Sequence, residues 1–171
     1  MANTVAALIG HARSLDPGGD YRIGRAEALE FPDESFDLVV SYLSLVDIPD
    51  AETAIAEMAR VLRPGGALLI ANLNSFNTAV VGGGWQRSVD GEVRHCIDNY
   101  LEERSEWLAW RGIRILSWHR PLSRYMSLLL AQGMMLRHFD EPPPLGGDPE
   151  KEARYRRIPY AWLMEWEKPR T

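Results

Sequence analysis

Residues 36–50 read F-D-L-V-V-S-Y-L-S-L-V-D-I-P-D, and residues 60–73 read R-V-L-R-P-G-G-A-L-L-I-A-N-L. Each segment holds a near-continuous apolar run, which is typical of a strand that is buried on both faces of a parallel sheet. Between these runs, residues 51–62 have apolar side chains at helical spacing, and Pro64 with its two following glycines ends the helix. The order predicts a strand–helix–strand unit with helices on both faces of its sheet. Its functional loops are expected at the carboxyl ends of the strands, within residues 41–47 and 72–77.

The segments that flank this unit are predicted to extend its sheet or to cover it. Residues 4–13 have the spacing of a helix, and residues 21–24 alternate like a short strand. Near the C-terminus, Trp162, Met164 and Trp166 alternate with other residues, as they would in an antiparallel strand. The elements expected after the central unit are helix 121–132, strand 134–141, helix 149–157 and strand 161–167.

Residues 74–133 have a different composition, with polar stretches, several tryptophans and the run Gly82-Gly83-Gly84. We interpret this region as a lid or substrate region, in which the glycines form a hinge. The expected pairing joins residues 92–97 to residues 113–118, with a helix or turn over 99–108 between them. The whole chain is then one truncated domain, divided into a cofactor side (1–73), this lid (74–133) and a closing strand pair (134–171).

Composition excludes several classes of function. The formal charge is −5 and no cluster of Lys and Arg occurs, which argues against a nucleic-acid partner. No apolar run approaches the ~20 residues of a membrane span. Cys96 is the only cysteine, so a cytoplasmic protein without an intrachain disulfide is expected. His95 beside it has no companions at metal-ligand spacing, so no metal is expected. The six tryptophans fit either an aromatic pocket or the core.

Two stretches carry a resemblance to a known family: A-E-A-L-E-F-P-D-E-S-F-D-L-V-V-S at residues 26–41 and A-I-A-E-M-A-R-V-L-R-P-G-G-A-L-L-I-A at residues 54–71. Over about residues 5–73 the sequence resembles the class I S-adenosylmethionine-dependent methyltransferases, in their small-molecule, ubiquinone-biosynthesis-like branch. The resemblance implies an α/β fold that is Rossmann-like but incomplete, mostly parallel, with an antiparallel C-terminal strand and a lid-like insertion. It also implies S-adenosyl-L-methionine as cofactor and a small molecule as methyl acceptor.

The sequence departs from the family pattern at its start. In the family a glycine-rich loop and an acidic residue at the end of the second strand hold the cofactor, but no G-x-G precedes residue 20 here. We therefore expect that a first strand, its helix and a second strand, roughly 40 to 60 residues, are lacking. Their loss would expose an apolar sheet edge, and self-association as a dimer is expected to cover it.

The resemblance assigns the rest of the cofactor site to two short segments. Arg25, Ala26 and Glu27 occupy the place of an acidic residue, a small residue and Glu, so the Ala26 amide could meet adenine. Arg25 replaces the acidic acceptor for the adenine amino group. Residues 41–43 match the loop beside the sulfonium and adenine, where the Tyr42 ring offers an electron-rich surface. Tyr42 could equally pack under the lid. The cofactor candidates are Arg25, Ala26, Glu27, Ser41, Tyr42 and Leu43.

His119 is the candidate general base, since an imidazole titrates near neutral pH and this one precedes the Pro121 helix. Its ring could instead cap that helix or bond a loop carbonyl. Residues at expected strand ends and in the lid are candidates for contacts with the acceptor, although asparagines in such places also form turns. These candidates are Asp47, Asn72, Asn74, Trp85, Trp118 and Glu141.

Two functions are compatible with the sequence. The first is a methyltransferase of a small organic acceptor, possibly impaired by the lack of the glycine-rich cofactor motif. The second is a non-catalytic, truncated methyltransferase-like module for binding or oligomerisation.

Overall fold

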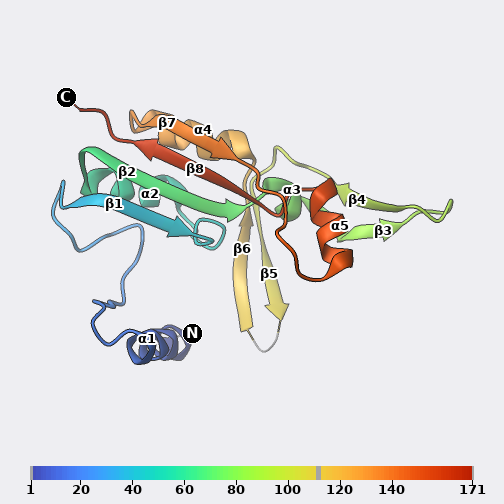
Figure 1. Ribbon diagram of the computed structural model, residues 1–171, viewed down its shortest axis with the longest axis horizontal. Coiled ribbons are helices and arrows are strands. Elements are labelled where there is room, and N and C mark those ends of the chain that lie inside the picture. The colour runs from blue at the N-terminus through green and yellow to red at the C-terminus, as the bar shows by residue number, and fades with distance from the viewer. Residues whose placement is uncertain (1, 111–112, 171) are drawn as a thin grey trace.

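The computed structural model describes residues 2–110 and 113–170. Its centre is a four-stranded sheet of order β1-β2-β8-β7 (Figure 1). Strand β1 (Phe36–Tyr42) runs parallel to β2 (Leu62–Leu73), whereas β8 (Ala161–Glu167) pairs antiparallel with both β2 and β7 (Met135–Asp140). The expected α/β fold and its antiparallel closing strands are confirmed, and the sheet in the described part of the chain is mixed.

Helix α2 (Ala51–Val61) makes the crossover between β1 and β2. Asp50 caps its N-terminus, since the Asp50 side chain accepts a hydrogen bond of 3.0 Å from the Thr53 amide. Gly65, near the start of β2, takes a φ of +79°, where a side chain would be strained. Strand β2 begins at Leu62, earlier than expected, and the pairing with β1 shifts register between Phe36 and Leu38.

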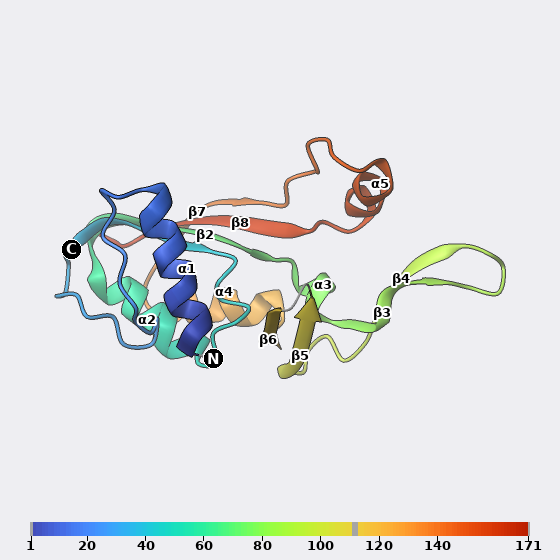
Figure 2. The ribbon, with the colours of Figure 1, turned by 90° about the horizontal axis from the view of Figure 1, so that it is seen from below.

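Helices α2 and α4 (Leu122–Ala131) lie on the same side of the sheet (Figure 2). Apolar side chains of α2, α4, β2 and β8 form the core on this side, with Trp162 and Trp166 fully buried. The expectation of helices on both faces is wrong for the described residues, because both helices that pack on the sheet cover one face. Helix α1 (Ala2–Leu15) lies apart from the sheet, off its β1 edge (Figure 1).

The lid region (74–133) contains two hairpins, so the expected pairing of residues 92–97 with 113–118 is wrong. Strand β3 (Val80–Arg87) pairs with β4 (Val93–Ile97), and β5 (Arg104–Trp110) pairs with β6 (Ile113–His119). A turn closes the first hairpin, in which the Ser88 amide donates to the Glu92 carbonyl at 2.8 Å. Pairing neighbouring segments closes shorter loops, which costs less chain entropy than the longer-range pairing.

Two smaller expectations also need correction. Residues 99–108 were expected to be helical or a turn, but residues 104–108 belong to β5 and only the first half forms a turn. Residues 21–24 form no strand, because no partner strand lies beside them among the described residues. Gly82-Gly83-Gly84 lies inside β3, and all three glycines have positive φ. The remaining elements, α3 (Ser75–Thr78) and α5 (Pro149–Arg157), complete the chain. Every helix among the described residues is too short or too polar to span a lipid bilayer.

Substitutions at Leu68 and Leu69 can test whether helices cover only one face of the sheet, because these neighbours in β2 point to opposite faces. The exposed fraction is 0% for Leu68 and 38% for Leu69. Leu68→Ala should lower the free energy of unfolding by about 2–5 kcal/mol, as cavities in packed cores do. Leu69→Ala should cost less than about 1.5 kcal/mol, since its side chain is partly solvated already. Urea denaturation of both variants measures these changes. Equal losses in the free energy of unfolding would contradict the conclusion that one face of the sheet is uncovered.

Candidate functional site

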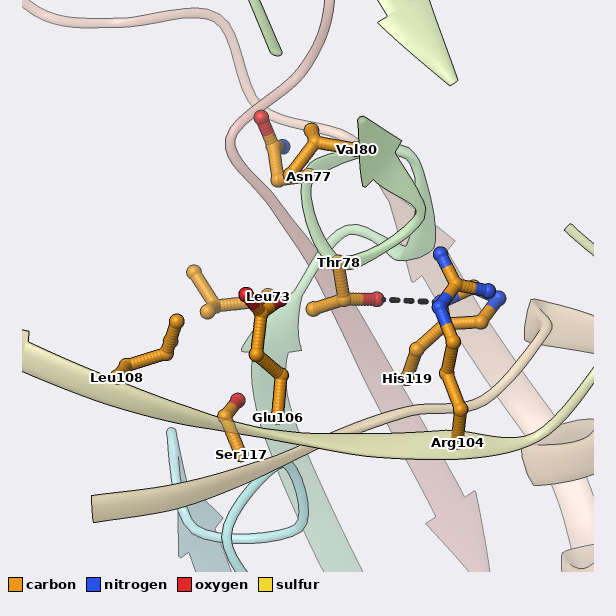
Figure 3. A pocket seen from close by; sticks show the side chains of 9 residues that line it. All are labelled: Leu73, Asn77, Thr78, Val80, Arg104, Glu106, Leu108, Ser117 and His119. Atoms are coloured by element: carbon orange, nitrogen blue, oxygen red, sulfur yellow. Dashed lines mark hydrogen bonds between the residues drawn. The ribbon is translucent and has the colours of Figure 1, made fainter. Parts of the chain in front are cut away.

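A cavity of about 110 Å³ lies beyond the carboxyl end of β2 (Figure 3). The end of β2, helix α3, the start of β3 and the β5–β6 hairpin form its walls. The cavity is lined by apolar side chains, the hydroxyls of Thr78 and Ser117, the His119 imidazole and the exposed Glu106. Arg104 lies beside His119 (Figure 3). The lining residues are Leu73, Asn77, Thr78, Val80, Arg104, Glu106, Leu108, Ser117 and His119.

Helix α3 is short, and hydrogen bonds to distant segments fix its position in this wall. Asn74 caps it by accepting from the Phe76 amide at 3.1 Å, while its own amide donates to Glu141 Oε1 at 2.6 Å. Ser75, which is buried, donates to the Arg120 carbonyl at 2.8 Å. These contacts tie α3 to the segment after β7 and to the end of the hairpin.

His119 is 3% exposed, and both of its ring nitrogens have partners. Nε2 lies 2.8 Å from the Tyr100 carbonyl oxygen and Nδ1 lies 2.8 Å from Thr78 Oγ1. A carbonyl can only accept, so Nε2 carries the proton and the neutral ring accepts the Thr78 hydroxyl proton at Nδ1. Burial lowers the pKa of His119, against the raising effect of the Tyr100 carbonyl. The imidazole therefore reaches the cavity through Thr78 (Figure 3).

The other candidates for contact with the acceptor are distributed over different places. Asn74 and Glu141 bind each other and support α3. Asn72, in β2, is buried, and its Oδ1 has no hydrogen-bond partner among the described residues. Trp118 alternates with His119 along β6 and lines a separate hollow next to Arg120. Trp85 lies in β3, where Arg157 stacks on its ring at 5.0 Å.

Asp47 lies in the loop after β1 and is half-buried. Burial raises the pKa of its carboxyl to about 6. A carboxyl with this pKa changes charge near neutral pH, so small changes in its surroundings alter its protonation.

The sequence reading did not single out Thr78, Arg104, Glu106 or Ser117, which line the cavity. Arg104, Glu106 and Leu108 recur at every second residue, a strand-like spacing that would have placed them on one face. The expectation of a helix or turn over 99–108 hid this signal.

The candidate cofactor residues of the first segment, Ser41–Leu43, lie at the end of β1 and are open to solvent on one side. Ser41 is buried and its hydroxyl lies 2.8 Å from that of Ser44, while the Leu43 amide donates to the Ala71 carbonyl at 2.7 Å. Tyr42, in contrast, is 72% exposed, and the outer edge of β1 has no neighbouring strand in the described residues.

The second cofactor segment packs more closely. Ala26 packs on the core, and the Glu27 side chain is mostly buried, 3.6 Å from the Arg25 guanidinium. The described residues nevertheless do not fit a whole S-adenosylmethionine molecule, since one side of the Tyr42 loop is open. Nor do the residues that the structure describes include a group of three or more His, Cys, Asp or Glu side chains that could hold a metal ion.

Comparison with known proteins identifies the family. Residues 2–70 match the family model described as a methyltransferase domain. A ubiquinone/menaquinone biosynthesis C-methyltransferase UbiE from Hahella chejuensis is 42% identical over 83 residues. Over residues 2–70 the chain matches the class I S-adenosylmethionine-dependent methyltransferases. The cofactor of this family is S-adenosylmethionine.

The methyltransferase domain has further relatives in sequence and fold. The malonyl-(acyl-carrier protein) O-methyltransferase of Yersinia pestis is 36% identical over 93 residues, 54% of this chain and 34% of that protein. The match to UbiE covers 46% of this chain and 33% of the relative. The sequence matches thus span about a third of these curated relatives. The solved S-adenosylmethionine-dependent methyltransferase from Mesorhizobium loti superposes with a TM-score of 0.81, at 23% identity, over 93% of this chain and 75% of that one.

His119 makes the stability of the domain depend on pH. Burial lowers the pKa of His119 in the folded state. Below about pH 6.5 the imidazole is therefore protonated in the unfolded chain but stays neutral in the folded chain. The free energy of unfolding should therefore lose a contribution between pH 7 and pH 5. In His119→Gln this part of the loss should disappear, which urea denaturation at several pH values would show. The same pH slope in both proteins would contradict a buried neutral imidazole.

Proposed function

We propose that this domain serves the transfer of a methyl group from S-adenosylmethionine to a small organic acceptor. The observation that carries the proposal is the cavity at the carboxyl end of β2, next to the strand end that bears Ser41–Leu43. Open α/β sheets bind their ligands at this edge. The names of two relatives, one for malonyl-acyl carrier protein and one for ubiquinone and menaquinone biosynthesis, support a small organic acceptor.

The cavity suits the reacting end of an acceptor better than a whole cofactor, because its volume is only about 110 Å³. Leu73, Val80 and Leu108 exclude water from part of it, while Ser117 offers a hydroxyl. Positioning and desolvation of this kind are the main contributions a protein makes to a transfer of this type.

His119 serves as the proton acceptor in this proposal, and it acts through Thr78. As the acceptor hydroxyl or amine loses its proton to Thr78 Oγ1, Thr78 passes its own proton to Nδ1 of His119, 2.8 Å away. The resulting imidazolium keeps its bond from Nε2 to the Tyr100 carbonyl. Asp47 and Asn72, at the ends of neighbouring strands, are the proposed polar contacts of the acceptor.

A second candidate function follows from the open side of β1. The unpaired edge, with Val40 60% and Tyr42 72% exposed, favours a non-catalytic module that binds or oligomerises through this strand. Unpaired strand edges readily pair with other chains. Self-association at this edge is compatible with both functions.

Calorimetric titration of the purified chain with S-adenosylmethionine and S-adenosylhomocysteine distinguishes the two functions. If the domain is a methyltransferase, both ligands should give saturable heat, weakly because one side of the site is open. Tyr42→Ala should weaken this binding about tenfold, since the ring is the exposed part of the proposed cofactor segment Ser41–Leu43. Leu69→Ala, on the same strand pair, is the control and should bind like the natural chain.

Absence of heat at millimolar ligand would contradict unaided catalysis by this polypeptide. In that case a molecular mass that rises with protein concentration in sedimentation would support the oligomerisation module. A constant monomer mass would contradict that module as well.

A further inference from the structure

Arg120 is a buried cation whose guanidinium makes three hydrogen bonds to one loop. It is 3% exposed and follows directly after β6. Its guanidinium donates to the carbonyls of Leu45 at 3.1 Å, Ile48 at 2.9 Å and Pro49 at 2.6 Å. Burying a charge is costly unless its donors are satisfied, and main-chain carbonyls satisfy these donors.

The backbone beside Arg120 holds the same loop. The Trp118 amide donates to the Val46 carbonyl at 2.6 Å, and the guanidinium of Arg120 lies over the Trp118 ring at 5.0 Å. The carbonyls on both sides of Asp47 are therefore bound by the end of the β5–β6 hairpin. Within the loop, the Asp47 amide donates to the Ser44 carbonyl at 2.9 Å.

A series of ion pairs links Arg120 to two helices through Glu103. The Arg120 Nε lies 3.4 Å from Glu103, the residue before β5, and Glu103 lies 3.0 Å from Arg124 Nε in α4. Arg124 in turn lies 2.9 Å from Glu52, in the first turn of α2. This network connects the hairpin to the two helices that carry the core.

We propose that Arg120 is a positioning residue, which fixes the loop Leu45–Pro49 to the β5–β6 hairpin and so sets the place of the Asp47 carboxyl at the carboxyl end of β1. Asp47 has no side-chain hydrogen bond or ion pair in the described part of the chain, so its surroundings depend on the backbone on either side. The use of this placement in methyl transfer rests on the proposed function. The fixing of the loop does not.

The test follows the titration of Asp47 by ¹³C NMR in the ligand-free protein. In the natural chain the midpoint should lie near 6, because burial raises the pKa of Asp47. Arg120→Lys keeps the positive charge but loses the planar guanidinium, whose separate N–H groups reach different carbonyls. Arg120→Gln also loses the charge. In both variants the loop should loosen and admit water, and the midpoint should fall by about one unit or more toward the ordinary value of about 3.9.

The direction of the shift separates positioning from charge. Loss of a nearby cation alone would raise the pKa of Asp47, so a fall in Arg120→Gln reports solvation of the loop. Hydrogen exchange at the Asp47 amide should accelerate at least about tenfold in both variants. Arg124→Gln is the matched control: it breaks the same network without touching the loop, and its Asp47 midpoint should stay near that of the natural chain.

An unchanged midpoint and exchange rate in a folded Arg120 variant would overturn the proposal. If neither variant folds, the natural chain decides: an Asp47 amide as protected as those of β2 supports a fixed loop, and exchange at the rate of an open loop overturns it. No cofactor enters these measurements. A failed titration with S-adenosylmethionine would therefore contradict the methyltransferase function and leave this proposal standing.

Discussion

The parallel pairing of β1 with β2 is the constraint on which the rest of the structure depends. It brings the carboxyl ends of both strands to one edge of the sheet, where the Leu45–Pro49 loop and helix α3 begin. The β5–β6 hairpin packs against both segments, through Trp118 and Arg120 on the loop and His119 on Thr78. The cavity therefore lies between the end of β2, helix α3, the start of β3 and the β5–β6 hairpin, which the sheet edge brings together.

The two parts of the proposed site at this edge differ in how far they are enclosed by protein. On the acceptor side, His119 is 3% exposed and every polar group on its ring has a partner. On the cofactor side, Tyr42 is 72% exposed and β1 has no outer neighbour among the described residues. The same apolar side chains that suit a sheet covered on both faces are left in solvent here, which makes an interaction at β1 energetically favourable.

The sequence predicted the central unit and the closing strands well, because long apolar runs and helical spacing report burial directly. The strand from Ala161 to Glu167 was predicted with its observed bounds, and its tryptophans fill the core. The lid was predicted poorly, since its short strands mix polar and apolar residues and local turn geometry decided their partners. Arg120 could not be recognised, because a cation bound by main-chain carbonyls looks like any surface arginine in a sequence. Whether His119, Asp47 and the Tyr42 loop act on substrate and cofactor stays a prediction.

The central claim is that β1 is an open edge that a second copy can cover. Native-state hydrogen exchange of the Phe36–Tyr42 amides at a low and a high protein concentration tests it most directly. At low concentration alternate amides should exchange fast, because in a parallel pair only every second amide of β1 can bond to β2. At high concentration the fast amides should become protected. Complete protection of all β1 amides at both concentrations would contradict the open edge.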